Sequence, residues 1–444
     1  MPQPRNLTTD SVLRSILFFS IPYLFSSFLQ TLYGMADLFI TGQFNTTAEI
    51  TAVSIGSQVM HMFTVMIVGL SMGTTVNIGK AVGGQDNRQA ASFMGNSVSL
   101  FAILSIGLTA ILLLLVHPIV QLVSTPAEAV EETVRYLTIC FLGIPFITAY
   151  NVISSIFRGL GDSKTPMLFV AIACVLNIAL DYLLIGTFGM KASGAALATV
   201  IAQAFSVLIS LAVILKSKNG IHPAGKDFIL HKDTFFPILK IGIPVSLQEG
   251  FIQIAFLVIT IIVNRRGLVD AAAVGIVEKI ICFIFLVPSA MLSTVSALSA
   301  QNIGAQKPER ARTTLRYAMT ICFVFGLAVA LIFQTVSEQV VSIFDRNQDV
   351  VVAGGQYLRS YIFDTMFAGL HFCFSGYFCA IGKSWISFMH NTISILLIRI
   401  PGSYMLSVLF TDTIYPLGFA AMTGSILSAV ICAIAYFALR KKSI

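Results

Sequence analysis

Long uninterrupted apolar runs constrain this chain more than any other feature of its sequence. A bilayer core of about 30 Å requires roughly 20 apolar residues of helix. The chain contains twelve runs of about this length, near residues 15–41, 51–76, 93–117, 134–157, 167–187, 194–215, 236–263, 271–298, 315–337, 356–380, 385–410 and 416–438. The runs lack period-2 alternation, so they predict transmembrane helices rather than barrel strands. We expect an all-α integral membrane protein.

The overall composition supports this expectation. Of the 444 residues, 56% are hydrophobic and 11% are charged, whereas a soluble domain carries roughly 25% charged residues. The first fourteen residues are polar, and the apolar run after them is too long for a signal peptide. All seven cysteines fall in apolar runs without histidines at metal-ligand spacing. We expect them to be small buried side chains.

Basic residues are distributed unequally between the two sides of the predicted membrane. If the N-terminus is cytoplasmic, nineteen of the 27 Lys and Arg residues lie in inside segments. Six lie in outside segments: Arg135, Lys191, Arg265, Arg266, Arg346 and Arg359. The positive-inside rule therefore predicts that both termini are cytoplasmic. We expect a multi-pass protein of the plasma membrane, which in a bacterium is the inner membrane. The same distribution explains the net charge of +7 without a nucleic-acid partner.

The two halves of the chain repeat each other. The segment "SIPYLFSSFLQ" recurs as "GIPVSLQEGFIQ", "AVGGQDNRQAA" as "NIGAQKPERAR", and "FRGLGDSKTP" as "FCAIGKSWIS". The paired residues are Pro22 with Pro244, Gln85 with Gln306, Tyr136 with Tyr357, and Gly161 with Gly382, so the shift is 222 once and 221 three times. We expect an N-terminal six-helix bundle at 1–215, a cytoplasmic linker at 216–235 and a C-terminal six-helix bundle at 236–444. Parallel repeats of this kind suit two pseudo-symmetric bundles around a central cavity.

One acidic residue, Asp37, lies inside the first apolar run. A charge at mid-membrane costs about 3 kcal/mol on insertion scales, so it needs a partner, a cavity or a proton. Gln30 and Tyr33 share its helix face. Asn177 and Asp181, four residues apart in the fifth run, also share a face.

These motifs together resemble the multidrug and toxic compound extrusion (MATE) family along the whole chain. The resemblance rests on "MADLFITGQF", "GGQ", "FRGLGDSKTP" and "NIALDYLLIG" at matching positions of a six-plus-six repeat. It implies a secondary active antiporter that exports small organic, often cationic, compounds in exchange for H⁺ or Na⁺, with no cofactor. It also implies that four residues form the N-terminal cation site: Asp37, Asn177, Asp181 and Thr199. The only metal ion that we expect at this site is Na⁺.

The second half does not repeat this acidic set. Asp37 maps to Ile259, Asn177 to Ile398 and Asp181 to Gly402. Its own intramembrane candidates are Glu249, Glu278, Lys279, Asp364, His371 and Arg399. Some family members place a coupling site there, with a Glu in span 7 and an Asp in span 10. We expect residues of this set and of the first half to contribute to substrate binding or to a second coupling site: Glu249, Glu278, Asp364, His371, Arg399, Gln30 and Tyr33. Arg399 could instead pair with Asp364 or Glu278, and Glu249 could attract cationic substrate. His61, His371 and His390 are expected to be packed and hydrogen-bonded, with His371 also a proton candidate.

Two further expectations concern mechanism. Pro22 lacks an N–H and weakens the first helix, so it is the predicted hinge for alternating access. No phosphate-binding loop of the required spacing and no nucleophile–base or zinc motif occurs, so we expect neither ATP hydrolysis nor an enzyme. The alternative is that the protein is a flippase of the same superfamily, which moves lipid-linked precursors or polysaccharides across the membrane. We expect a monomer in the lipid bilayer.

Overall fold

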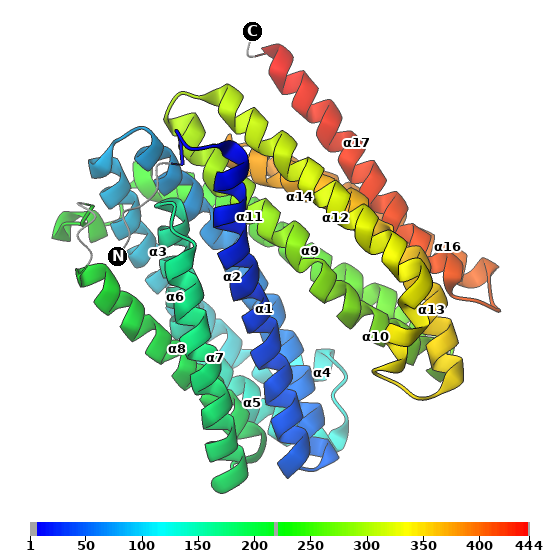
Figure 1. The fold of residues 1–444 in the computed structure, drawn as a ribbon. Helices are drawn as coiled ribbons and strands as arrows, with labels where there is room; N and C mark the ends of the chain where they lie inside the picture. Colours follow the sequence, from blue (N-terminus) through cyan, green and yellow to red (C-terminus); the bar gives the residue numbers. More distant parts are fainter. Residues whose placement is uncertain (1–6, 217–220, 443–444) are drawn as a thin grey trace. The chain divides into compact units, whose positions relative to one another are not determined.

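The computed structural model describes residues 7–216 and 221–442, which form helices joined by short turns, with no strand among them (Figure 1). The first half contains α1 (Val12–Phe44), α2 (Thr47–Gly83), α3 (Asn87–Leu114), α4 (Val116–Leu122), α5 (Val130–Leu142), α6 (Ile144–Gly159), α7 (Lys164–Asp181), a π-helix η2 (Tyr182–Thr187) and α8 (Lys191–Lys216). The second half contains α9 (Lys232–Asn264), α10 (Leu268–Ile284), α11 (Leu286–Gly304), α12 (Pro308–Ser342), α13 (Gln348–Tyr361), α14 (Asp364–Ala380), α15 (Ser384–Ser394), a π-helix η4 (Ile395–Arg399), α16 (Ile400–Leu409) and α17 (Gly418–Lys442). Short 3₁₀ turns are η1 (Ala127–Ala129), η3 (Gly225–Phe228) and η5 (Tyr415–Leu417).

Each of the twelve predicted spans coincides with one helix or with two or three consecutive helices. Among the described residues, ten helices are long and apolar enough to cross a membrane. An eleventh candidate is the pair Ala127–Leu142 and Ile144–Gly159, which is bent by 47°. The remaining predicted span, 356–380, corresponds to parts of α13 and α14, which are separated by a break at Ile362–Phe363. The all-α membrane fold is therefore confirmed, although several spans are broken.

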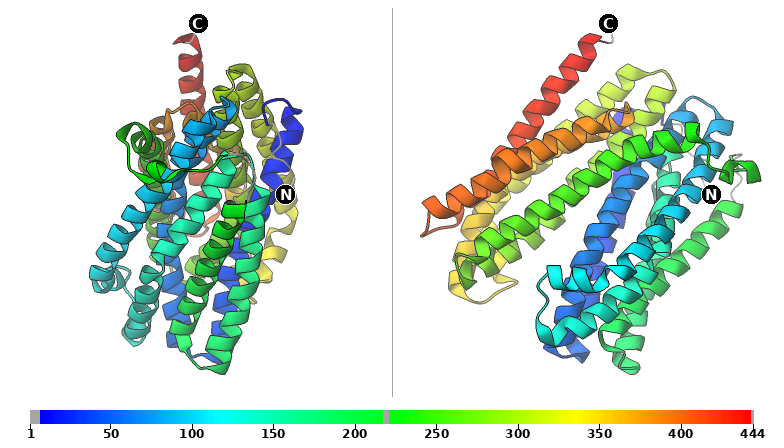
Figure 2. Two further views of the ribbon diagram at one scale, coloured as in Figure 1. Left: turned by 90° about the vertical axis from the view of Figure 1, so that its left-hand side faces the viewer. Right: turned by 180° about the vertical axis from the view of Figure 1, so that it is seen from behind.

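The chain forms two compact units that do not follow its two halves strictly. Among the described residues, one unit comprises residues 21–216 and 221–242, and the other comprises residues 7–20 and 243–442. The first segment of α1 thus belongs to the second unit, and the first segment of α9 belongs to the first (Figure 2 shows the helices from two sides). Pro22 and Pro244 each lie within two residues of the point where their helix changes unit.

Each unit has apolar cores of its own. In the first unit, Ile40, Val53, Leu137 and Phe141 belong to one cluster, all at most 1% exposed. In the second unit, Ile16 and Phe19 from the start of α1 join a cluster with residues of α11, α12, α14 and α17. Buried apolar area is the main stabilising term in such cores.

The backbone at two turns confirms the internal repeat. Gln85 and Gln306, paired by sequence, have φ angles of 59° and 57°. Gly161 and Gly382, also paired, have φ angles of 88° and 77°. Left-handed backbone is costly for a residue with a Cβ, so matching turns at matching positions indicate that both halves fold as the same unit.

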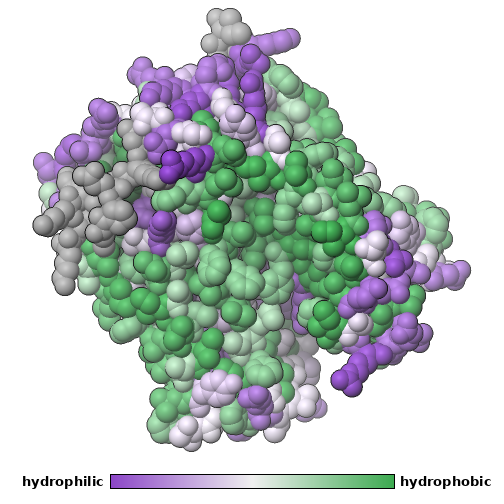
Figure 3. Space-filling model, viewed as in Figure 1, coloured by the Kyte–Doolittle hydropathy of each residue, from purple (hydrophilic) through white to green (hydrophobic). Residues whose placement is uncertain are grey.

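Apolar side chains cover the outer faces of the helices. In Figure 3, hydrophobic residues dominate the helix faces, and hydrophilic residues gather near the helix ends. Leu114, Leu122 and Leu268 are each more than 80% exposed. Extended apolar surface of this kind is typical of a protein that contacts lipid.

A salt bridge fastens the segment before α9 to α3 within the first unit. The Arg88 guanidinium donates to both carboxylate oxygens of Asp227, at 2.7 and 2.6 Å. The side chain of Asn96 donates to the Asp227 carbonyl and accepts from the His231 N–H. Gly95 lies against the Asp227 carbonyl so closely that a Cβ would stand 2.5 Å from its oxygen. Of the predicted linker, residues 217–220 lie outside the described part of the chain.

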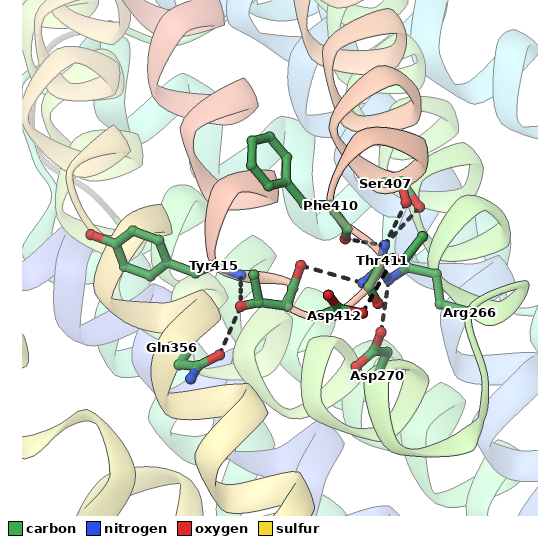
Figure 4. A network of polar contacts seen from close by, with 9 residues as sticks. Arg266, Asp270, Gln356, Ser407, Phe410, Thr411, Asp412 and Tyr415 are labelled. Atoms are coloured by element: carbon green, nitrogen blue, oxygen red, sulfur yellow. Dashed lines mark hydrogen bonds and ion pairs between the residues drawn. The ribbon is translucent and has the colours of Figure 1, made fainter.

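An arginine joins two helix ends in the second unit (Figure 4). Arg266 follows α9, and its Nε donates to Asp270 at 2.7 Å. Its remaining nitrogens donate to the carbonyls of Ser407, Phe410, Thr411 and Thr413 beyond the last turns of α16. Positive charge at a helix C-terminus satisfies carbonyls that have no partner within the helix.

The Arg88–Asp227 salt bridge leads to a stability prediction. Arg88 holds the pKa of the Asp227 carboxyl below its ordinary value. We expect Asp227→Asn to lower the free energy of unfolding by about 1 kcal/mol at neutral pH, because Arg88 is half exposed and solvent weakens the pair. The unfolded carboxyl binds protons more readily, so this contribution is lost as pH falls through the folded pKa.

Thermal unfolding of the purified protein measures this difference. Asp233→Asn, at an exposed position close by, serves as the control and should change little. An Asp227→Asn protein with the wild-type unfolding temperature at neutral pH would contradict the prediction.

Candidate functional site

Three helices of the first unit bring the predicted cation-site residues together. Asp37 lies on α1, Asn177 and Asp181 lie on α7, and Thr199 lies on α8. Asp37 is 3% exposed, and Asn177 and Asp181 are 1% and 0% exposed. On the opposite face of α1, Phe39 is 64% exposed. Asp37 therefore faces the interior of its unit.

Hydrogen bonds connect three of these four side chains. The Thr199 hydroxyl donates to Asp37 Oδ2 at 3.2 Å, and Asn177 Nδ2 donates to Thr199 Oγ1 at 3.4 Å. The carboxyl groups of Asp37 and Asp181 are both buried and interact electrostatically. Two neighbouring buried carboxylates disfavour ionisation of both unless a proton or another cation neutralises the pair.

Several oxygens of this cluster lack a donor. Asp37 Oδ1, Asn177 Oδ1 and both carboxylate oxygens of Asp181 are buried without a hydrogen-bond partner among the described residues. A buried polar atom without a partner costs about 1–3 kcal/mol. Oxygens gathered without donors are the ligands that hard cations prefer. The donor set thus fits a proton or a sodium ion.

The local backbone at the cluster is irregular. After Asp181 the α-helix changes to the π-helix η2, which extends to Thr187. Short π-helical segments are rare and occur frequently at functional sites. On α1 the Thr41 hydroxyl donates to the Asp37 carbonyl at 2.6 Å, within an unbroken α-helix. Asp181 therefore lies at a change of helix geometry, and Asp37 lies in regular helix.

A polar layer lies next to the cluster on α1 and α8. Gln203 Nε2 donates to the Tyr33 hydroxyl at 3.3 Å, and Gln30 interacts electrostatically with Tyr150. Gln30 and Tyr33 are half-buried, as a substrate contact would require. Sequence reasoning missed Gln203 and Tyr150. Gln203 follows Thr199 by four residues, and this spacing was the available signal.

The candidates in the second unit do not form one cluster. Asp364 and Glu278 were the two expected partners of Arg399. Arg399 Nη2 lies 3.2 Å from Asp364 Oδ2, so Asp364 is the partner. Glu278 lies in a pocket with Arg399, and its carboxylate oxygens lie 3.5 Å from the Thr260 hydroxyl. Glu249 is half-buried on α9 and makes no hydrogen bond or ion pair with another described residue. Lys279 is exposed.

The histidine and cysteine expectations hold only in part. His371 and His390 are buried, and their Nε2 atoms lie 3.3 Å from Ser425 Oγ and 2.9 Å from Ser375 Oγ. His61 is exposed, so its predicted burial is wrong. Six cysteines are buried, but Cys282 is exposed, and its predicted burial is also wrong. Both residues lie on exposed faces of apolar helices, and the sequence does not distinguish these faces from the packed ones.

The predicted hinge at Pro22 lies inside an unbroken helix. Helix α1 continues from Val12 to Phe44 through the proline. The Ser26 hydroxyl donates to the Pro22 carbonyl at 3.1 Å. Proline removes one backbone hydrogen bond at this point, and the hinge role stays a prediction.

Comparison with known proteins identifies the family. The MatE family profile matches residues 22–183 and 244–405, one copy in each half. "Probable multidrug resistance protein YpnP" of Bacillus subtilis (strain 168) is 30% identical over 402 residues, covering 90% of each chain. "Multidrug export protein MepA" of Staphylococcus aureus (strain MSSA476) is 25% identical, covering 84% of this chain and 82% of that protein.

A solved structure supports the same fold. The outward-facing conformation of a multidrug resistance MATE family transporter superposes with a TM-score of 0.91 at 23% identity, covering 98% of each chain. The matched profile ranges also show that the two copies are related by a shift of 222 residues at both ends. The chain therefore belongs to the MATE family of multidrug transporters.

Proposed function

We propose that this transporter is an antiporter that exports small organic, often cationic, compounds in exchange for H⁺ or Na⁺. The observation that carries the proposal is the buried cluster of oxygens without donors at Asp37, Asn177 and Asp181. A purely structural role would favour a donor for each of these oxygens. An exchangeable cation or proton is the partner that their chemistry requires.

Cation occupancy provides the link to movement. When the site faces outward, a proton or Na⁺ neutralises the Asp37–Asp181 pair and removes the repulsion between the carboxylates. Helix α1 can then repack against α7 and α8, which favours outward release of a bound compound. Without the cation, the two carboxylates favour the arrangement that binds substrate. Differential binding of the ion to two arrangements is what couples them.

The energy available from the ion suffices for export. For a neutral compound, one charge moving inward through about 100 mV contributes about 2.3 kcal/mol, which corresponds to a concentration ratio of roughly fiftyfold. A monovalent cation exported one-for-one costs the same amount against that potential, so its export is driven by the concentration gradient of the ion. This requires alternating access between two openings. Pro22 supplies the bend on α1, since one backbone hydrogen bond is missing there. Cytoplasmic termini in a plasma membrane complete the arrangement, because most basic loops then face inward.

The substrate class follows from the relatives and from the polar layer beside the cation cluster. Related proteins are named for multidrug resistance and multidrug export. Tyr33 and the amide of Gln30 offer a flat aromatic face and a hydrogen-bond acceptor close to an acidic pair. Aromatic faces attract organic cations. We place a substrate contact at Tyr33 and Gln30 on this basis.

Transport into everted vesicles tests the antiport. A fluorescent organic cation should accumulate under a pH gradient or a Na⁺ gradient applied separately. Asp37→Asn should reduce driven uptake at least tenfold while the protein still folds, because the amide is neutral at every pH and leaves only one acid in the cluster. Asp349→Asn, an exposed acid on α13, is the matched control and should transport normally.

Two outcomes would change the proposal. Normal driven uptake by Asp37→Asn would remove this residue from coupling. If no organic cation moves under either gradient, the flippase alternative gains, and transfer of a labelled lipid-linked precursor becomes the assay.

Thermal unfolding without substrate provides an independent test of the cluster. Wild-type protein at about pH 8 should gain stability from added Na⁺ or from acidification, because either ligand binds only the native cluster. Asp181→Asn should unfold a few degrees higher without Na⁺, since the variant removes one of two neighbouring buried carboxylates and supplies an amide donor. Its response to both ligands should be smaller. A wild-type response equal to that of Asp181→Asn would contradict the site.

A further inference from the structure

The repeat relates the cation cluster of the first unit to a pocket in the second. A shift of 222 pairs Asp37 with Ile259, Asn177 with Arg399, and Asp181 with Ser403. All three of these second-unit residues line one pocket. The shift of 221 that we used to pair Asn177 and Asp181 would give Ile398 and Gly402, which do not line it. The pocket is therefore the counterpart of the cation cluster.

The chemistry of the counterpart is reversed. Neither of the two acids of the first unit is repeated, since an isoleucine and a serine take their places. Where the first unit places the neutral amide of Asn177, the second places the guanidinium of Arg399. A guanidinium is protonated at every physiological pH and cannot leave. The second unit thus contains a covalently attached cation at the position where the first has an exchangeable-ion cluster.

Arg399 is held in place from three sides. Its Nη2 lies 3.2 Å from the Asp364 carboxylate, whose side chain is 0% exposed, and donates to Ser425 Oγ at 2.8 Å. Gly424 makes room for the side chain, because a Cβ there would lie 2.6 Å from Arg399 Cγ and 3.1 Å from its Nε. The absence of a side chain at Gly424 therefore leaves the space that this arginine occupies.

The surroundings contain few other charges. Helix α14 carries Asp364 and His371, α15 carries His390, and α12 places Cys322 beside Cys373. Helix α17 contributes the Ser425 hydroxyl, which also contacts His371, and α11 contains no titratable residue. The pocket itself contains Glu278, Tyr357 and Tyr361. Arg399 is the one described cation within salt-bridge distance of Asp364.

We propose that Arg399 is a built-in cation that permanently neutralises Asp364 at the counterpart of the cation cluster, so that this place exchanges no ion. The inference rests on the proposed coupling role of the first cluster. It assigns ion exchange to the first unit alone and gives the second unit a fixed electrostatic state. The repeat thereby becomes asymmetric: one copy changes charge during the cycle, and the other does not.

The proposal predicts that removing the guanidinium creates a cation requirement. A buried carboxylate that loses its partner must take up a proton or a metal cation to be neutral again. We expect Arg399→Gln to unfold at a lower temperature than its parent, and added Na⁺ or acidification should recover most of the loss. Choline chloride at the same concentration is the control for ionic strength. Arg399→Lys should need no added cation.

The parent protein for this experiment carries Asp37→Asn and Asp181→Asn, which silences the first cluster. Adding Asp364→Asn to Arg399→Gln should restore stability without any added cation, because no unpaired charge remains. Asp364→Asn alone should lose stability that neither Na⁺ nor acid restores. If Arg399→Gln fails to fold, the double variant still decides the question, since folding of the double variant supports charge pairing.

Several results would overturn the proposal. An Arg399→Gln protein as stable as its parent, or one insensitive to Na⁺ and acid, would show that Asp364 needs no cation. Failure of the Asp364→Asn, Arg399→Gln double variant to fold would assign Arg399 a packing role. A parent that still gains stability from Na⁺, with the gain abolished by Glu278→Gln, would place an exchangeable ion in the second unit. All readouts are unfolding temperatures, so failure of organic-cation transport would leave them unaffected.

Discussion

A buried carboxylate in an apolar helix bundle needs a positive partner, and this requirement shapes both halves of the transporter. Insertion scales put the cost of such a charge at about 3 kcal/mol without a partner. In the first unit, Asp37 and Asp181 lie together without a cationic side chain, and several of their oxygens lack donors. In the second unit, Asp364 lies against Arg399. The arrangement in the first unit suits an exchangeable cation, whereas the second unit already contains a fixed cation.

The fold allows this difference because it duplicates backbone without duplicating chemistry. The two copies share left-handed turns at Gln85 and Gln306 and at Gly161 and Gly382. Both copies also contain a π-helical segment close to their central charged residue, η2 after Asp181 and η4 ending at Arg399. A common scaffold thus presents side chains at matching places, and substitution at those places alone makes the halves unequal.

Sequence predicted the parts of this account that depend on apolar length and helical spacing. The helices, the repeat and the set Asp37, Asn177, Asp181 and Thr199 follow from such patterns and from family resemblance. Sequence did not predict that Gln203 would contact Tyr33, because this pairing depends on how α1 and α8 rotate against each other. The exposure of His61 and Cys282 was missed for a related reason: both helices are apolar on their exposed and on their packed faces. The pairing of Asn177 with Arg399 depends on whether the repeat is shifted by 221 or by 222 residues at this point. The short motifs gave both values, so the sequence alone did not decide the pairing.

The central claim is that this chain has one exchangeable cation site, formed by Asp37 and Asp181. Equilibrium binding of ²²Na⁺, together with proton uptake measured at equilibrium on purified protein, counts exchangeable cations directly. The account predicts that the wild type binds one cation per chain, either Na⁺ or H⁺, more than the protein in which both acids are replaced by asparagine, because the remaining titratable groups bind protons equally in both. No difference between the two proteins, or Na⁺ binding that persists after both replacements, would contradict it.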